Sequence, residues 1–237
     1  MSWRNHPLLF GLIALLGPVV LAGCGGGGSG GNPAGQFETV SPRQLWTELF
    51  SAQPPTVLDV RSANAYALSH LPHSLSSPGC GCAATLSQAP APPVSEVVVG
   101  VTEDDEHLAA TPLLLRGEHV RLLAGGLSAW KLGLDINDTT LHGWLLAARN
   151  LRLLDVRTPA EWQAKRIAGT ENKPLANIDQ WAPTLSPTEE FVLICSAGQR
   201  STAARDNLAK RGLTKIHNLL GGTEGWHFGW VGNQVGG

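Results

Sequence analysis

The chain has 237 residues, 43% of them hydrophobic, and a formal net charge of -2 at pH 7. This length and apolar share allow either one large domain or two small ones with packed cores. Because neither half carries a long basic run, the charge pattern argues against electrostatic binding of nucleic acid, and we expect no nucleic-acid partner.

The first 23 residues have the pattern of an export signal. Arg4 and His6 precede an apolar stretch over residues 7–21, which is shorter than the ~20 residues that span a bilayer comfortably. The stretch runs into Leu21-Ala22-Gly23-Cys24, which resembles the lipobox of bacterial lipoproteins. The resemblance implies removal of residues 1–23 as a lipoprotein signal peptide and lipidation of Cys24. An ordinary cleaved signal followed by a chance cysteine is the alternative.

Residues 24–36 are expected to be the lipidated cysteine and a tether. The segment 25–35 is almost entirely glycine, with Ser, Asn, Pro and Ala, and it lacks the apolar surface needed to order itself. A flexible coil of about a dozen residues reaches roughly 20 Å. We therefore expect a lipid-anchored protein of the cell envelope that faces the periplasm. The residue directly after Cys24 is Gly25 and not an acidic one, which, by resemblance to enterobacterial lipoproteins, favours the outer membrane.

The remaining chain repeats itself at a separation of 96 residues. The segment VLDVR at 57–61 recurs as LLDVR at 153–157, and the double glycine at 125–126 with its following tryptophan recurs at 221–222. Self-similarity at a fixed spacing indicates homologous units, and each unit is large enough for its own core. The repeat predicts two domains, over residues 37–134 and 135–237.

Within each copy, short apolar runs alternate with amphipathic ones. In the first copy the pattern predicts a helix over 42–50 and strands over 56–60, 96–101 and 120–123. In the second copy it predicts strands near 151–156, 191–195 and 215–219 and a helix over 201–211. Short apolar strands separated by helices predict an α/β fold in which each copy is a small parallel sheet flanked by helices.

Cys195 stands between a predicted strand and a predicted helix. The apolar run 191–194 precedes it, and residues 196–200 lead into the helix. In open α/β sheets this edge, at the carboxyl ends of the strands, is where ligands bind. Backbone N–H groups and the helix dipole would favour the thiolate there and cradle an anion. With Cys24 set aside, three cysteines remain, and Cys195 is the natural unpaired one.

The segment CSAGQRS at 195–201, with DVR at 155–157 and GGTEGW at 221–226, resembles the rhodanese domain. The resemblance covers the whole chain beyond the tether. It implies a sulfurtransferase that takes sulfane sulfur from thiosulfate or a persulfide donor onto a nucleophilic cysteine. The resulting persulfide then passes the sulfur to a thiophilic acceptor, such as a thiol or cyanide. No metal or other cofactor is expected.

The resemblance assigns roles to individual residues of the second copy. Cys195 is the expected nucleophile, and Arg200 either binds the leaving sulfite or braces the loop. Gly198 is expected to supply a backbone geometry that other residues resist. The expected substrate-binding loop consists of Ser196, Ala197, Gly198, Gln199, Arg200 and Ser201. Asp155, Arg157 and Glu161 are expected to support this loop by pairing with its cations.

Three other interpretations of Cys195 compete with this one. An inert, buried cysteine at a strand end would need neither the glycine of the loop nor Arg200. A related cysteine phosphatase would place five residues between cysteine and arginine, whereas four stand here. A non-catalytic rhodanese-like module that binds a partner or senses sulfur remains the alternative from another class of protein.

The first copy lacks the reactive residue. Aligned on its strand, the position of Cys195 falls on Val99 or Gly100, and the segment that follows, 102–107, contains four carboxylates. Those charges would repel an anionic donor. We expect this domain to be non-catalytic and to serve the interface, stability or the choice of a protein partner.

Two more cysteines, Cys80 and Cys82, lie in the first copy. They could close a local disulfide, pair outside the copy, or join His70 and His73 in a metal site, although nothing in the spacing fixes four ligands. We take the local disulfide as the leading interpretation and predict no metal. Both histidines are otherwise expected at the surface, near a turn.

Overall fold

The computed structural model describes residues 37–78, 96–100, 106, 109–111, 113 and 119–231. The predictions for the signal peptide, Cys24, the tether, Cys80 and Cys82 lie outside the described residues. The described part belongs to one compact unit, Phe37–Gly237, which is distinct from Met1–Gln36.

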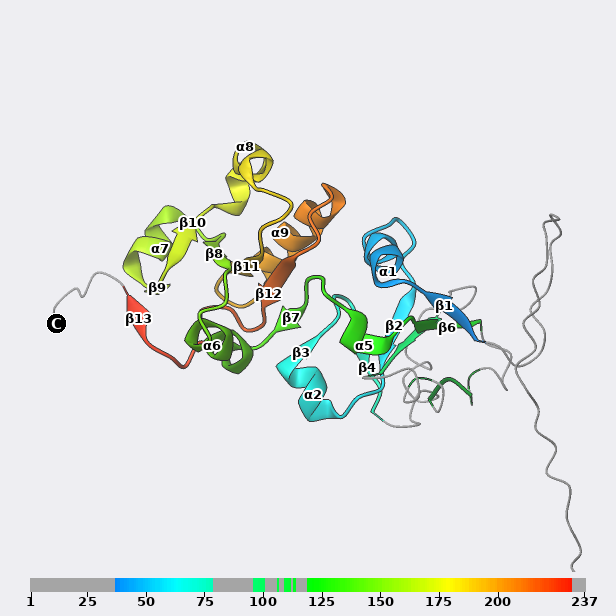
Figure 1. Ribbon diagram of the computed structural model, residues 1–237. Helices are drawn as coiled ribbons and strands as arrows, with labels where there is room; N and C mark the ends of the chain where they lie inside the picture. The colour runs from blue at the N-terminus through cyan, green and yellow to red at the C-terminus, as the bar shows by residue number, and fades with distance from the viewer. Residues whose placement is uncertain are drawn as a thin grey trace, which may run out of the picture. The chain divides into compact units, whose positions relative to one another are not determined.

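The first copy is built on a five-stranded parallel sheet with the strand order β1-β6-β5-β2-β4 (Figure 1). Its strands are β1 (Glu38–Val40), β2 (Thr56–Asp59), β4 (Leu75–Ser76), β5 (Glu96–Val99) and β6 (Val120–Leu123). Its helices with described bounds are α1 (Pro42–Leu49), α2 (Ala63–Leu68) and α5 (Gly126–Ala129). Ser41 begins α1 by accepting a hydrogen bond from the backbone N–H of Gln44, and Pro42 occupies the first turn.

The second copy has a sheet with the order β10-β8-β11-β12-β7, and β3 of the first copy is added at its edge. The strands are β7 (Asp135–Ile136), β8 (Arg152–Asp155), β10 (Thr170–Asn172), β11 (Phe191–Ile194) and β12 (Ile216–Leu219). The helices are α6 (Asp138–Leu146), α7 (Pro159–Ala164), η1 (Leu175–Asn177), α8 (Ile178–Trp181), η2 (Ala182–Thr184) and α9 (Gln199–Lys210). Strand for strand, this order repeats that of the first sheet. The predicted class, two α/β copies each with a parallel sheet flanked by helices, is confirmed.

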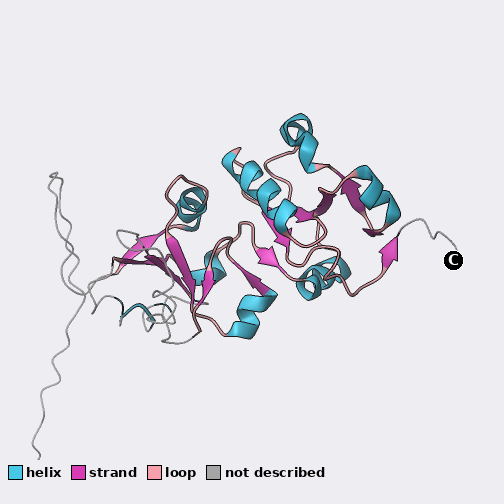
Figure 2. Cartoon of the chain, turned by 180° about the vertical axis from the view of Figure 1, so that it is seen from behind, coloured by secondary structure: helices cyan, strands magenta, loops and turns pink. Residues whose placement is uncertain are grey.

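The core of the second copy lies on both faces of its sheet. Phe191 and Leu193 of β11 point into a cluster with α8 and α9, whereas Val192 and Ile194 point into a cluster with α6. Figure 2 shows the helices on both sides of these strands. All four side chains of β11 are 0% exposed, and burying each one contributes about 1.5–3 kcal/mol. The strand that carries Cys195 is therefore held rigidly from both sides.

Short strands connect the two copies. β3 (Ser69–His70) pairs antiparallel with β7, so that His70 lies opposite Asp135. In the second copy the equivalent pairing joins β9 (Arg166–Ile167) to β13 (Trp230–Val231). In both cases the strand that follows the double glycine pairs antiparallel with an earlier two-residue strand, and β7 also pairs with β12 in the sheet of the second copy. The expectation that His70 lies at the surface is wrong, because this pairing and stacking on Tyr66 leave His70 only 9% exposed.

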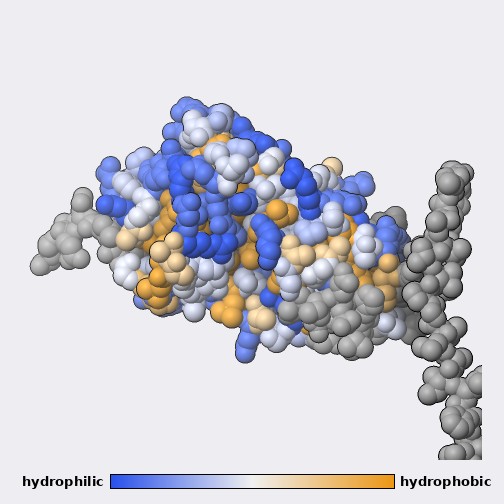
Figure 3. All heavy atoms as spheres, in the orientation of Figure 1, coloured by the Kyte–Doolittle hydropathy of each residue, from blue (hydrophilic) through white to orange (hydrophobic). Residues whose placement is uncertain are grey.

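The face seen in Figure 3 is largely hydrophilic, with hydrophobic atoms gathered over α6. Leu146, at the end of this helix, is 75% exposed. Among the residues that the structure describes, no helix has the length and apolarity required to cross a membrane.

Candidate active site

Cys195 directly follows β11, and the loop from Ser196 to Gly198 leads into α9, which begins at Gln199. Gly198 has a φ of +104°, a left-handed backbone angle that favours glycine and that turns the chain sharply into the helix. The turn aims the amino end of α9 back at the sulfur. Cys195 is a free thiol and only 1% exposed, so a donor must reach a recessed sulfur.

Hydrogen-bond donors surround the sulfur atom. The backbone N–H of Gly198 lies 3.1 Å from Sγ, and the hydroxyl of Ser201, itself 2.9 Å from the Gly198 carbonyl oxygen, lies 3.4 Å from Sγ. Burial raises the pKa of the Cys195 thiol, but the Ser201 hydroxyl and the backbone N–H groups of residues 197, 198 and 201 outweigh it. The pKa therefore lies below its usual value, and the thiolate is favoured.

Arg200 braces the loop from its outer side. Its guanidinium makes two hydrogen bonds to the Glu161 carboxylate, at 2.8 and 2.9 Å, and a third to Ser196 Oγ at 2.6 Å. The hydrogen bonds from Arg200 lower the pKa of Glu161 to about 2. Glu161 also completes the capping box with Thr158 at the start of α7. The sequence left two roles open for Arg200, and these contacts are those of a brace.

Asp155 and Arg157 pair with each other rather than with Arg200. The Arg157 side chain reaches both Asp155 oxygens at 2.7–3.0 Å and also donates to the Lys165 carbonyl oxygen. The first copy contains the same pair, Asp59 and Arg61, in the same arrangement. Because that copy lacks the cysteine, this pair is a feature of the fold that shapes the strand end beside the loop.

The double glycine at 221–222 holds the other side of the loop, a role that the sequence did not reveal. Thr223 N donates to the Cys195 carbonyl oxygen at 2.7 Å, and Glu224 N donates to that of Ser196 at 2.8 Å. A Cβ atom on Gly222 would lie 2.2 Å from the Cys195 oxygen, so only glycine allows this approach. The signal in the sequence was the repetition of the double glycine. It indicated a turn but did not show that this turn contacts the loop that contains Cys195.

The remaining predicted loop residues lie at the edges of this arrangement. The backbone N–H of Ala197 helps to lower the pKa of the Cys195 thiol, and Gln199 is exposed in the first turn of α9. Trp226 is 5% exposed and donates its indole N–H to the Gly229 carbonyl oxygen, as expected for a core residue. No group of three or more His, Cys, Asp or Glu side chains suited to a metal occurs within the described part of the chain.

The register of the first sheet decides which residue occupies the position of Cys195. Asp59 lies opposite Val99, and its counterpart Asp155 lies opposite Ile194, so Gly100 corresponds to Cys195. The backbone N–H of Gly100 donates to the Glu106 carboxylate at 2.8 Å, and Glu106 is 0% exposed. At this strand end the second copy has the Cys195 thiol, whereas the first copy has a glycine whose backbone N–H donates to a buried carboxyl group.

These features define a protein of two α/β copies, one of which ends its central strand in a cysteine enclosed by a loop of N–H donors. The sequence profile described as "Rhodanese-like domain" matches residues 41–132 and 141–228, which is more than half of the chain. The chain therefore belongs to the rhodanese-like domain family.

Curated relatives match about a third of the chain each. The chain is 36% identical to the uncharacterized protein YqhL of Bacillus subtilis over 33% of its own length and 62% of that protein. It is 30% identical to the thiosulfate sulfurtransferase PspE of Escherichia coli over 29% of its own length and 67% of that protein. A crystal structure of a thiosulfate sulfurtransferase from Pseudomonas aeruginosa aligns with 84% of this chain and 44% of that one, at 21% identity and a TM-score of 0.40.

Proposed function

We propose that the chain is a sulfurtransferase that carries sulfane sulfur as a persulfide on Cys195. Its family and its resemblance to named sulfurtransferases support a role of this type. The observation that carries the proposal is the set of donors on Sγ, because a sulfur surrounded by N–H and O–H groups is stable as a thiolate and as a persulfide anion.

The reaction divides into two displacements. The Cys195 thiolate attacks the outer sulfur of thiosulfate, a new S–S bond forms, and the old S–S bond breaks with its electron pair leaving on sulfite. With a persulfide donor, a thiolate leaves instead. The acceptor, a thiolate or cyanide, then attacks the outer sulfur of the persulfide and returns Cys195 to the thiolate. The loop donors stabilise the negative charge on sulfur through both steps.

In this proposal the first copy takes no part in the chemistry. It has Gly100 at the position of the nucleophile and the Glu106 carboxylate on the adjoining backbone N–H. The Glu106 carboxylate does not act as a nucleophile toward sulfane sulfur, and its negative charge would repel an anionic donor.

The test is sulfur transfer from thiosulfate to cyanide, followed as thiocyanate, with the chain from Gln36 onward. We expect turnover that is abolished in Cys195→Ser and retained in the double variant Cys80→Ser, Cys82→Ser. Equal loss in the double variant would put the first copy on the sulfur path. Slow stoichiometric labelling of Cys195 without turnover, with either thiosulfate or a persulfide donor, would contradict the proposal and favour a binding or sensing protein.

We further propose that Cys24 carries a lipid and holds the enzyme at the cell envelope, facing the periplasm. The support is the sequence Leu21-Ala22-Gly23-Cys24 and the glycine-rich segment that follows it. Expressed with its full signal, the chain should fractionate with membranes and the Cys24→Ala variant should not. Outer-membrane rather than inner-membrane density on a sucrose gradient is the expected position. Equal distribution of the two forms would contradict the anchor.

A further inference from the structure

A buried polar cluster joins α9 to the sheet of the second copy. Its members are Asp135 of β7, Asn218 of β12 and Arg205 of α9, which are 7%, 1% and 1% exposed. Asp135 Oδ1 accepts a hydrogen bond from the Arg205 guanidinium and a second one, at 3.1 Å, from Asn218 Nδ2. Burying polar side chains costs free energy even when they satisfy one another, so a cluster of this kind calls for a reason.

The first copy shows that the fold does not require a polar residue at the position of Asn218. The corresponding residues, 96 positions earlier, are Leu122 and Thr39, and they pair in the same register as Asn218 and Asp135. Leu122 is 0% exposed and packs in an apolar cluster. Asn218 instead leaves its Oδ1 buried without a donor in the described structure, which is a cost that leucine avoids. The copy that bears this cost is the copy that has Cys195.

Asn218 also contacts the helical turn that follows the cysteine loop. Its Nδ2 carries two hydrogens, and the second acceptor is Thr202 Oγ1 at 3.2 Å. Thr202 directly follows Ser201, and its backbone N–H donates to the Gly198 carbonyl oxygen at 2.9 Å. The Ser201 hydroxyl lies 3.4 Å from Cys195 Sγ. The amide of Asn218 therefore fixes the first turn of α9 against β12 and, with it, the position of this hydroxyl beside the sulfur.

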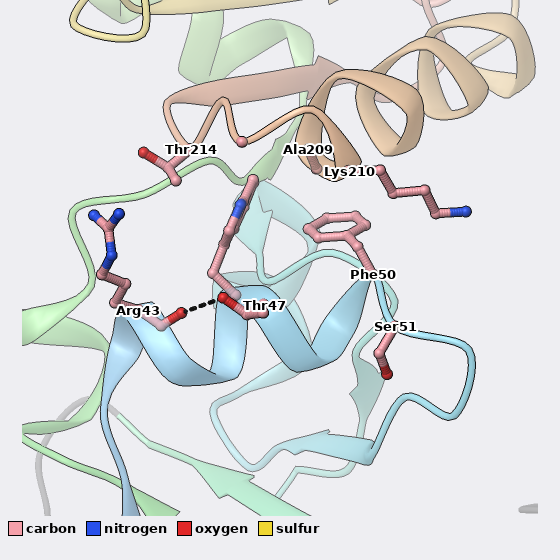
Figure 4. Close-up of a pocket in the computed structure, with 9 residues that line it drawn as sticks. Arg43, Thr47, Phe50, Ser51, Ala209, Lys210 and Thr214 are labelled. Carbon is pink, nitrogen blue, oxygen red and sulfur yellow. Dashed lines mark hydrogen bonds between the residues drawn. The ribbon is translucent and has the colours of Figure 1, made fainter.

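The first copy packs against the same helix. Phe50 of α1 points toward the end of α9 that carries Ala209, and both residues belong to one buried cluster (Figure 4). The guanidinium carbon of Arg205 lies 5.8 Å from the centre of the Phe50 ring, and one of its nitrogens lies 3.3 Å from Nε2 of His73. The arginine that holds Asp135 is thus itself in contact with the first copy.

We propose that Asn218 is a positioning residue for the proposed sulfur transfer, because through Thr202 it holds the first turn of α9 in place beside Cys195. Asp135 and Arg205 orient its amide, and the first copy completes the arrangement by packing on Arg205. The copy without a nucleophile thereby supports the chemistry of the other copy. This inference rests on the proposed function for its choice of site, but the charge state of the thiol can be measured without any sulfur transfer.

The test is the pH profile of Cys195 alkylation by iodoacetamide, followed on the Cys195 peptide by mass spectrometry, with the chain from Gln36 onward. In Asn218→Leu, we expect the midpoint of the profile to move upward and the alkylation at pH 7 to slow roughly threefold. The value of kcat/KM for thiosulfate should fall by a similar factor. Arg205 stays on Asp135 in this variant, so no buried charge is left unpaired and the fold should persist.

His217→Leu is the matched control for a buried polar residue on the same strand. His217 precedes Asn218 and is also 1% exposed, but its ring contacts Trp144 of α6 and not α9. Its replacement should lower the melting temperature and leave the pH profile of alkylation in place. Thr202→Val removes the hydroxyl that accepts from Asn218 and should reproduce the upward shift, whereas Thr202→Ser keeps a hydroxyl and should not.

Three results would overturn the proposal. The first is an unchanged profile in Asn218→Leu, the second is an equal shift in His217→Leu, and the third is an equal shift in Thr202→Ser and Thr202→Val. The two variants of Thr202 decide the matter if Asn218→Leu folds poorly. A lack of sulfur transfer in the unmutated chain would contradict the proposed function alone, because alkylation requires only the Cys195 thiolate.

Discussion

At the scale of single residues, the charge state of Cys195 depends on which groups donate hydrogen bonds to its Sγ. The backbone donors are fixed by the turn at Gly198, whereas the Ser201 hydroxyl can rotate between the sulfur and the Gly198 carbonyl oxygen. A hydroxyl with two acceptors can follow a changing charge. It turns to the sulfur when the thiolate forms and can turn back when that charge is lost.

We expect Ser201→Ala to raise the pKa of the Cys195 thiol. One charge-assisted hydrogen bond is lost, while burial continues to favour the neutral form. At pH 7 the alkylation of Cys195 by iodoacetamide should slow by roughly five- to tenfold, and the midpoint of its pH profile should move upward. Ser201→Thr keeps the hydroxyl and serves as the matched control. Identical pH profiles for Ser201→Ala and the unmutated chain would show that the backbone donors suffice.

Arg200→Gln tests whether Arg200 supports the loop or binds the sulfur donor. The guanidinium is bound to Glu161 and Ser196, so its removal should loosen the loop and lower turnover with thiosulfate and with glutathione persulfide in the same proportion. Glu161→Gln should produce a weaker defect of the same kind. A rise in KM for thiosulfate alone would instead show that Arg200 contacts the sulfite group.

The ion pair between Arg200 and Glu161 should remain intact between pH 5 and pH 9. The pKa of Glu161 in the fold, about 2, lies below its usual value of about 4.3. A depressed carboxyl pKa stabilises the fold fully above the unfolded value, and this contribution is lost as pH falls through about 2. The activity ratio of Glu161→Gln to the unmutated chain should therefore stay constant between pH 5 and pH 9, as a pH series of the thiocyanate assay would show.

At the scale of elements, the close approach of the 221–225 turn to the cysteine loop explains the double glycine. We expect Gly222→Ala to push this turn off the Cys195 carbonyl oxygen and to abolish most of the turnover. Gly169 is the matched control, because it also has a positive φ, +79°, but a Cβ atom there meets nothing within 4 Å. Gly169→Ala should cost about 1 kcal/mol in urea unfolding and spare activity. Similar activity loss in both variants would contradict the steric explanation.

The elements also show what a sequence can and cannot predict. The apolar run before Cys195 is observed as β11, and the strand expected over 56–60 is observed as Thr56–Asp59, because buried parallel strands are uniformly apolar. The two-residue strands β3 and β7 are too short to show such an apolar run. Their pairing is decided by contacts between distant segments. Gly222 illustrates the same limit at the site, since its partner lies 27 residues earlier in the chain.

At the scale of the whole molecule, the two copies share a polar junction. Arg205 of α9 is 1% exposed and pairs with Asp135 of β7 and with Asp206. Its guanidinium also lies 3.3 Å from Nε2 of His73, a residue of the first copy whose φ is +61°. Together with the pairing of β3 and β7, these contacts bind the copies into one cooperative unit, and we expect a single unfolding transition.

Arg205→Leu tests whether this junction depends on its buried charge. The substitution leaves the Asp135 carboxylate, 7% exposed, without its main cation, and the free energy of unfolding in urea should fall by about 3–5 kcal/mol. Arg211→Leu, in an exposed ion pair with Asp179 near the end of the same helix, should cost less than about 1 kcal/mol. Replacing Asp135 by leucine as well should recover much of the loss, because no buried charge then remains unpaired. If Arg205→Leu costs no more than Arg211→Leu, the copies are held together by packing and strand pairing alone, and the buried arginine is dispensable to the junction.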